Sequence, residues 1–479
     1  MKKKLLIGVL WTSIHQFFSQ VIHFFISIIL ARLLLPEDFG LVAIVLIFIA
    51  IGESLYRTGL SQSIVRSKNI DQDDYSTVFW FNMIGSIIIY SFIFLLSQII
   101  ARFYNELILS SLIRVSSLSI IIGAFSSLHN TRLTKEMNFK RLAIIDIPSI
   151  LAMGIVGISL AYFGYGVWSL IWSNLARLFV SSVLLILNSK WTPSMKFKKE
   201  KFIVHFKFGY KMTLSRLLDT IFNNIYFMII GKLFSPIQLG YYFRADTLKQ
   251  YPVNNISIIL NKVTYPFFAE IQDDNINLKK TYKEIMQLVF FLVTPILVLM
   301  AVLAKPIFLF LFTDKWLPSI SYFQILCIAG IFHPLISYNL NILQVKGKSG
   351  LFLKIEIIKK IMTLIIILLS FSYGIYGLLW GQVILSFISF LINSHYAGII
   401  INYSAFMQIK DIFPVILISL ISGGSTYLLY KLLISILNNK FIFSLFLATI
   451  FFVLIYILIS YIFKIKILKK FKIIGDFVK

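Results

Sequence analysis

Apolar runs of about twenty residues recur along the whole of this 479-residue chain, and each is long enough to cross a hydrocarbon core roughly 30 Å thick. Such runs must be helices in lipid, because a helix satisfies its own backbone hydrogen bonds. Hydrophobic residues make up 58% of the chain and charged residues 14%. Because no water-soluble fold could bury that much apolar surface, the sequence predicts an all-α, polytopic membrane protein.

The apolar runs and the charged breaks between them predict about fourteen transmembrane helices. The predicted spans are 9–31, 40–62, 77–101, 108–129, 145–163, 167–188, 209–231, 238–261, 286–304, 319–340, 355–373, 377–401, 412–434 and 441–463. The first run continues past Arg32 without a small-residue cleavage site, so we interpret it as a retained span and not as a signal peptide.

The net charge of +25 would suggest a nucleic-acid partner in a soluble protein, but here topology explains it. Lysine and arginine gather in alternate connections, including the stretch Lys190–Lys211 and the tail after the last span. The intervening connections are poor in both residues. Since cytoplasmic loops carry the excess of lysine and arginine, both termini are predicted to be cytoplasmic, and no nucleic acid is expected as a partner.

An internal repeat divides the chain. The segment Ala31–Gly40 matches Gly231–Gly240 two hundred residues later, with a basic residue, a leucine, a proline and a glycine in equal positions. Each copy contains six spans, so the copies should share one orientation and be related by a pseudo-two-fold axis along the membrane normal. The predicted organisation is a six-helix bundle over 1–190, a basic cytoplasmic linker over 191–208, a second six-helix bundle over 209–402, and two additional helices with a basic tail over 403–479.

Polar stripes on the first and seventh spans predict a wet internal surface. Gln16 and Gln20 lie on one helical face of the first span, and Arg216 and Asn223 lie on one face of the seventh, with Asp219 adjoining. The same pattern would also arise if the stripes only joined the two halves through hydrogen bonds.

Charged residues inside other spans need a partner, water or a function, because each costs roughly 2.5–3.5 kcal/mol near the bilayer centre. Glu53 and Arg57 are four residues apart on the second span, which suits either an ion pair or a cavity lining. The eighth span contains Arg244, Asp246 and Lys249, and its surplus of positive charge suits a phosphate. Arg177 on the sixth span is a weaker candidate, since it could lie near a helix end and extend to the interface.

Several catalytic patterns are missing from the sequence. It has no Gly-rich phosphate loop of the Walker type, no legible Ser-His-Asp arrangement and no metal-ligand cluster, so neither a metal nor a cofactor is expected. Its single cysteine, Cys327, leaves no internal disulfide. Glu37 and Asp38 occupy an outer loop where a glycosyltransferase could keep a base, but the repeat has Ile237 and Gln238 at these places, which favours a simple turn.

The segments Leu33–Leu41, Thr58–Gln62, Leu239–Ala245 and Tyr265–Phe267 resemble the polysaccharide-transporter branch of the multidrug/oligosaccharidyl-lipid/polysaccharide exporter superfamily. That branch contains the Wzx-type flippases of O-antigen, capsule and teichuronic acid synthesis. The resemblance implies two six-helix bundles around a central cavity, alternating access, and an undecaprenyl-diphosphate-linked oligosaccharide as substrate. It further implies a bacterial cytoplasmic (inner) membrane location, with membrane lipids and polysaccharide polymerase or assembly proteins as partners.

The resemblance also assigns the first, second, seventh and eighth helices to the cavity, where the polar residues above already lie. The expected substrate-binding residues are Arg216, Arg244, Arg57, Arg177, Lys249, Gln16, Gln20 and Asn223. Family members are thought to use an ion gradient, and the expected coupling residues are Glu53, Asp219 and Asp246.

Three other functions remain open at this point. A multidrug or metabolite exporter would share the fold, although cationic drugs disagree with an arginine-rich cavity. A membrane polymerase or glycosyltransferase would usually need a large outer loop, and every outer connection predicted here is short. A scaffold for a synthesis complex could use the basic inner loops to bind anionic lipid or partner enzymes.

Overall fold

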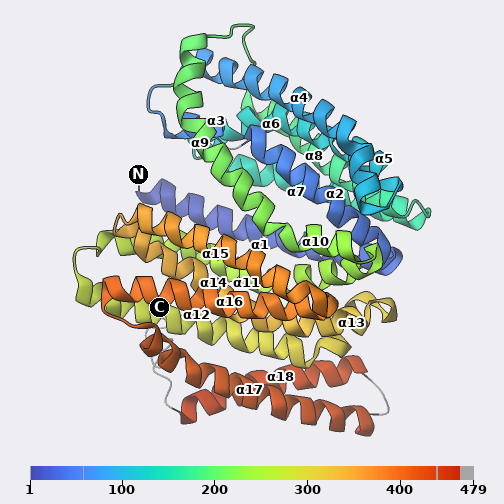
Figure 1. Ribbon diagram of the computed structural model, residues 1–479, viewed down its shortest axis with the longest axis vertical. Coiled ribbons are helices and arrows are strands. Elements are labelled where there is room, and N and C mark those ends of the chain that lie inside the picture. Colours follow the sequence, from blue (N-terminus) through green and yellow to red (C-terminus); the bar gives the residue numbers. More distant parts are fainter. Residues whose placement is uncertain (1, 58, 438–440, 464–479) are drawn as a thin grey trace. The chain divides into compact units, whose positions relative to one another are not determined.

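The computed structural model describes residues 2–57, 59–437 and 441–463, and within these ranges it is helical and contains no strand. The predicted basic tail over 464–479 lies outside the described residues. The chain divides into two compact units, Met1–Phe243 and Arg244–Lys479, whose helices are labelled in Figure 1.

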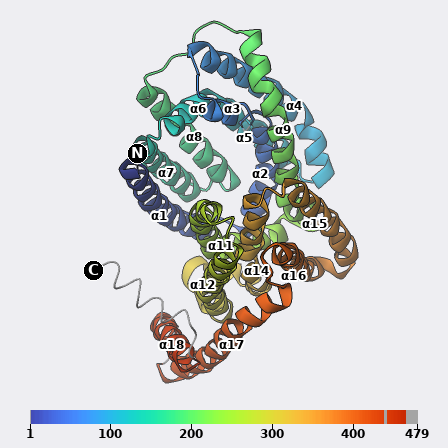
Figure 2. The same ribbon diagram turned by 90° about the vertical axis from the view of Figure 1, so that its left-hand side faces the viewer.

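Unit 1 consists of α1 to α10 and the start of α11. Its helices are α1 (Lys2–Leu33), α2 (Pro36–Arg57), α3 (Gly59–Arg66), α4 (Gln72–Tyr104), α5 (Ile108–Ser116), α6 (Leu118–Lys135), α7 (Phe139–Tyr162), α8 (Val167–Ser189), α9 (Lys199–Asn223), α10 (Ile225–Leu233) and α11 (Pro236–Glu270). Here α1 packs along α7, whereas α9 packs along α3 and α2 (Figures 1 and 2).

Unit 2 contains the rest of α11 and the helices that follow. They are α12 (Asn275–Val302), α13 (Ala304–Phe312), the short 3-10 helix η1 (Asp314–Trp316), α14 (Ser319–Val345), α15 (Ser349–Ser370), η2 (Phe371–Tyr373), α16 (Gly374–Ile401), α17 (Ala405–Ile436) and α18 (Phe441–Ile462). Its core is built around Tyr282, Tyr338 and Phe390, which are fully buried. The hydroxyl group of Tyr282 donates to Asn339 and lies 3.0 Å from Oε1 of Gln408, so the polar groups in this core pair with one another.

The all-α membrane fold predicted from the apolar runs is confirmed. Eleven segments of the described residues are long and apolar enough to cross a membrane, and one of them, Ser349–Ile401, contains both α15 and α16. The seventh and eighth predicted spans fall on α9, α10 and α11, which are not among the eleven segments. Polar residues lower the hydropathy of α9 and α11, so the count of fourteen spans stays a prediction.

The start of α4 anchors the linker between the two predicted halves. Asp71 is the N-cap of α4, and Asp71 and Asp74 form a reciprocal capping box. The backbone N–H of Asp74 and the ammonium group of Lys201 hold the pKa of the Asp71 carboxyl well below its usual range. The indole of Trp191 donates to Gln72 at 2.6 Å, and Ser194 donates to Ser76 at 3.0 Å. The linker is therefore fastened to one helix terminus of unit 1.

The two copies of the repeat meet at their glycines. A β-carbon added at Gly40 would lie 1.8 Å from the carbonyl oxygen of Pro236, and one added at Gly240 would lie 1.8 Å from the carbonyl oxygen of Pro36. The reciprocal contact means that the first turns of α2 and α11 cross backbone to backbone. Only glycine permits an approach this close, which explains why both copies have glycine at this position.

We predict that Gly240→Ala destabilises unit 1 by roughly 1–3 kcal/mol, because the obstructing atoms are backbone and cannot move aside as a side chain would. The measurement is thermal unfolding of the purified protein in detergent. The matched control is Gly85→Ala on α4, where an added β-carbon meets nothing within 4 Å. Equal unfolding temperatures for the two variants would contradict the backbone crossing.

Candidate polar pocket in unit 1

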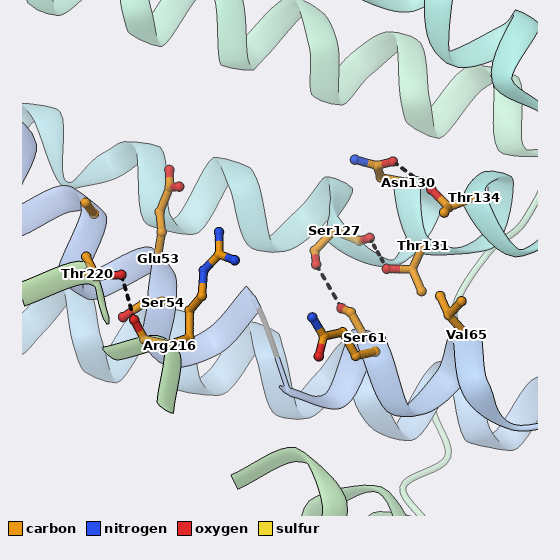
Figure 3. A pocket seen from close by; sticks show the side chains of 12 residues that line it. Glu53, Ser54, Ser61, Val65, Ser127, Asn130, Thr131, Thr134, Arg216 and Thr220 are labelled. Carbon is orange, nitrogen blue, oxygen red and sulfur yellow. Dashed lines mark hydrogen bonds between the residues drawn. The ribbon is translucent and has the colours of Figure 1, made fainter. Parts of the chain in front are cut away.

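A cavity of about 570 Å³ lies in unit 1 between α2, α3, α6 and α9 (Figure 3). Its size is within the range of typical ligand pockets. Its lining residues are Ala50, Glu53, Ser54, Ser61, Gln62, Val65, Ser127, Asn130, Thr131, Thr134, Arg216 and Thr220. Eight of these twelve side chains carry a hydroxyl or an amide group, one is a carboxylate and one is a guanidinium. The pocket is therefore polar, which is unusual inside a bundle of apolar helices.

One wall of the pocket is a polar stripe on α6. Ser127, Asn130, Thr131 and Thr134 are spaced by three and four residues, so they lie on one face of the helix. Thr131 donates to the carbonyl oxygen of Ser127 at 2.8 Å, and Thr134 donates to the amide oxygen of Asn130 at 3.4 Å. The hydroxyl groups of Ser127 and Ser61 are 3.5 Å apart and join α6 to α3 (Figure 3).

The charged residues of the pocket come from α2 and α9. Glu53 and Arg216 both extend into the cavity (Figure 3). Arg216 is exposed, so its guanidinium group is accessible to a ligand. The neighbouring Thr220 donates to the backbone carbonyl of Arg216 at 2.8 Å. The arrangement offers a guanidinium group beside many groups that can both donate and accept hydrogen bonds.

The structure places the predicted site residues in several different surroundings. Glu53 and Arg216 line the pocket. Asn223 and Asp219 are exposed on α9, and Gln16 and Gln20 are half-buried on α1; none of these four residues is part of the lining. The side chain of Arg57, at the end of α2, lies outside the described residues.

Arg177 belongs to a separate polar cluster between α1, α7 and α8. Arg177 and Asp146 both interact electrostatically with His23. Ser19 of α1 donates to the carboxylate of Asp146 at 3.2 Å. Asp146 was not among the carboxylates singled out from the sequence, because it sits at the very end of the predicted fifth span.

Three predicted site residues of α11 lie in unit 2, where Arg244 and Lys249 are buried and Asp246 is half-buried. The guanidinium carbon of Arg244 lies 4.9 Å from the ring centre of Phe312 and 5.0 Å from that of Trp316, and only 2% of the residue is exposed. Lys249 donates to the carboxylate of Asp246, three residues earlier on the same helix, at 2.6 Å. In this structure the aromatic rings and the carboxylate stabilise these cations.

The α6 stripe and the α3 residues Ser61 and Gln62 were missed in the sequence. The stripe had a readable signal, since four polar residues recur at helical spacing near the end of the predicted fourth span. Ser61 and Gln62 lie at the end of the predicted second span and were noted only as part of the family-like segment Thr58–Gln62. In the part of the chain that the structure describes, no three His, Cys, Asp or Glu residues are grouped as metal ligands would be.

Comparison with known proteins identifies the family. Residues 29–321 match the family described as "Polysaccharide biosynthesis protein". This match covers more than half of the chain. The chain belongs to the polysaccharide biosynthesis protein family. The resemblance found in the sequence is thereby confirmed.

Relatives of this polysaccharide biosynthesis protein support the assignment. It is 26% identical to an "Uncharacterized membrane protein in cps region" of Klebsiella pneumoniae, over 82% of this chain and 80% of the relative. It is 23% identical to the "Lipopolysaccharide biosynthesis protein WzxC" of Escherichia coli (strain K12), over 75% and 73% of the two chains. It is 22% identical to the "Teichuronic acid biosynthesis protein TuaB" of Bacillus subtilis (strain 168), over 73% of each.

Solved structures with the same fold are transporters. The structure of "Lipid II flippase MurJ, inward closed conformation" matches with a TM-score of 0.77 and 16% identity, covering 94% of this chain and 98% of that one. An inward-facing multidrug resistance MATE family transporter of the MOP superfamily matches with a TM-score of 0.62 and 17% identity, covering 80% and 95%. The chain therefore has the fold of these multi-pass membrane transporters.

We predict that a cysteine placed in the pocket is accessible to water. In Gln62→Cys the new thiol should react with a small water-soluble thiol reagent, because only the thiolate reacts and it forms only in water. The control is Ile88→Cys, an exposed apolar position on the membrane-spanning α4, which we expect to face hydrocarbon and to stay unlabelled. Native Cys327, which is 2% exposed, should not react either. Equal labelling of positions 62 and 88 would contradict an aqueous pocket.

Proposed function

We propose that this protein is a flippase that moves an undecaprenyl-diphosphate-linked oligosaccharide from the cytoplasmic to the outer leaflet by alternating access. The observation that carries the proposal is the pocket of unit 1, which combines Arg216 with a lining of hydroxyl and amide groups. Family membership and the relatives named for polysaccharide biosynthesis support a lipid-linked sugar as substrate.

The chemistry of the pocket suits the head group of such a lipid. Sugar hydroxyl groups need both donors and acceptors once they leave water, and Ser127, Asn130 and Thr134 offer both. A guanidinium group binds phosphate oxygens through charge-assisted hydrogen bonds, which are roughly twice as strong as neutral ones. Arg216 is therefore proposed as the residue that contacts the diphosphate.

The remaining predicted residues keep narrower roles in this proposal. Glu53 is the proposed coupling carboxylate, because it lines the same pocket as Arg216. Asp219 and Asn223 lie further along α9, and we assign them contacts with the sugars when α9 moves. We also propose that the two halves predicted from the repeat form the transporter and that both termini lie in the cytoplasm.

A multidrug exporter is the second candidate, since a MATE transporter shares the fold. The pocket argues against it, because hydroxyl and amide groups bind sugars better than they bind large apolar cations. The relatives WzxC and TuaB are likewise named for the biosynthesis of lipopolysaccharide and teichuronic acid.

We predict that Arg216→Ala lowers surface polysaccharide roughly tenfold in a strain that depends on this protein, because a charge-assisted hydrogen bond to phosphate is lost. The measurement is cell-surface glycan per unit of inserted protein, with Arg216→Lys expected to retain part of the activity. The control is Arg141→Ala on α7, outside the pocket, where the guanidinium group donates to the backbone carbonyl of Asn188 at 3.4 Å. Normal glycan in Arg216→Ala would remove Arg216 from the site, and normal glycan after deletion of the whole gene would refute the function.

A further inference from the structure

Helix α3 has two functional faces. Ser61, Gln62 and Val65 on one face line the pocket. Gly59 and Ser63, one helical turn apart on another face, contact α9. This eight-residue helix therefore lies between the pocket and the part of α9 around His205 and Gly209, whereas Arg216 and Thr220, further along α9, line the pocket itself.

The first contact between α3 and α9 is a second backbone crossing. A β-carbon added at Gly59 would lie 2.0 Å from the carbonyl oxygen of Gly209, and one added at Gly209 would lie 3.0 Å from the carbonyl carbon of Gly59. Both helices have glycine at the crossing, so the two backbones touch, and the hydroxyl group of Thr213 lies beside them.

The second contact, one turn away, is a buried chain of three polar side chains. Ser63 of α3 lies 2.8 Å from Nδ1 of His205 on α9, and Nε2 of the same ring lies 3.1 Å from the carboxylate of Asp74 on α4. The exposed fractions of Ser63, His205 and Asp74 are 5%, 1% and 4%. The three side chains hold α9 against α3 and α4 where no water reaches them.

The polar groups of Ser63, His205 and Asp74 can be satisfied both when they contact one another and when α9 has moved away. The ring donates to Asp74 from Nε2, and the hydroxyl group of Ser63 can pair with Nδ1 in either protonation state, since a hydroxyl group both donates and accepts. While buried, each group would be destabilised by losing its partner. When α9 moves away, water replaces every partner, so separation leaves no polar group unsatisfied.

Ion pairs at the surface surround this chain. Lys201 contacts Asp71 and Asp74 at 3.0 Å each, and Lys198 pairs with Asp73. The hydrogen bond that Lys201 donates to the carboxylate of Asp74 raises the pKa of Lys201, so this lysine stays charged. The exposed pairs add little stability. Besides them, α9 is held by the buried hydrogen-bonded chain, the glycine crossing and aromatic contacts such as the one between Phe81 and Phe202, whose ring centres are 4.8 Å apart.

The repeat shows that the position of α9 is exceptional. Its counterpart in the first copy is α1, which packs along α7 of its own half. In contrast, α9 packs along α3 and α2, which belong to the other copy of the repeat. A helix that follows the linker and binds the opposite copy is suited to leave it.

We propose that the contact between α3 and α9, formed by Gly59, Gly209 and the chain Ser63–His205–Asp74, is a releasable closure of the polar pocket. This inference rests on the proposed function. When α9 separates from α3, the wall opens on the side of the lysine-rich loops. Arg216 and Thr220 move with α9, so the guanidinium group leaves the pocket in the same step that opens it.

The test measures access to the pocket and needs no substrate. Thr134→Cys on α6 places a thiol in the pocket, and membrane-impermeant thiol reagents are applied to vesicles of either orientation. Adding Ser63→Ala or His205→Ala should raise the labelling rate roughly tenfold from the side of the lysine-rich loops, because one buried hydrogen bond to an ionic chain is lost. His205→Gln, which keeps a donor for Asp74, should show a smaller rise.

The matched control is His129→Ala, which removes another buried histidine–serine contact of unit 1, 2.5 Å to Ser189 of α8, without touching α9. Labelling of Thr134→Cys that is unchanged in Ser63→Ala and His205→Ala, or that rises equally in His129→Ala, would overturn the closure. Failure of the proposed function would appear separately, as normal surface glycan after gene deletion alongside a changed labelling rate.

A cysteine pair gives a second measurement if the alanine variants do not insert. Oxidising Ser63→Cys/His205→Cys, or joining the two thiols with a short reagent, should stop the appearance of surface polysaccharide, and a reductant should restore it. Undiminished export by the fully crosslinked protein would also overturn the closure.

Discussion

Unit 1 depends on a helix crossing at which both helices have glycine. Gly40 and Gly240 let the first turns of α2 and α11 touch through their backbones, and each glycine meets the proline carbonyl of the other copy. Without side chains at this crossing, two copies of the repeat can meet within one compact unit. The crossing holds the start of α2 against the start of α11, which follows α9 and α10 along the chain. Close packing of small residues is a common way to join helices in lipid, because apolar side chains gain little when they leave lipid to contact one another.

The second constraint is that polar groups within a helical membrane protein must be satisfied. The structure uses two solutions in unit 1. Around Ser127, Thr131 and Arg216 the polar groups face a cavity, where water or a ligand can pair with them. At Ser63, His205 and Asp74 they pair with one another and exclude water. The two arrangements lie on different faces of α3, so one short helix separates the polar groups that face the cavity from those that are buried and paired with one another.

The sequence predicted the helical fold well and the site only in part. Apolar runs located the helices because hydropathy is a local property, and the Pro-Gly repeat pointed to the segments that meet at Gly40 and Gly240. Glu53 and Arg216 were predicted because charge inside a span is conspicuous. Local reasoning could not show that Phe312 and Trp316 would enclose Arg244. It could not bring His205 to Asp74 either, because 131 residues separate them.

Helix α9 explains why the pocket and its proposed closure belong together. Its polar character kept it out of the segments apolar enough to span a membrane by composition alone, and that same polarity places Arg216 and Thr220 in the pocket and His205 in the buried chain. A more apolar helix would insert more readily but could do neither. When such a helix separates, water can satisfy each polar group of its hydrogen-bonded chain and of its ion pairs. The marginal hydropathy of α9 is therefore the physical property expected of a helix that binds a polar head group in one position and releases it in another.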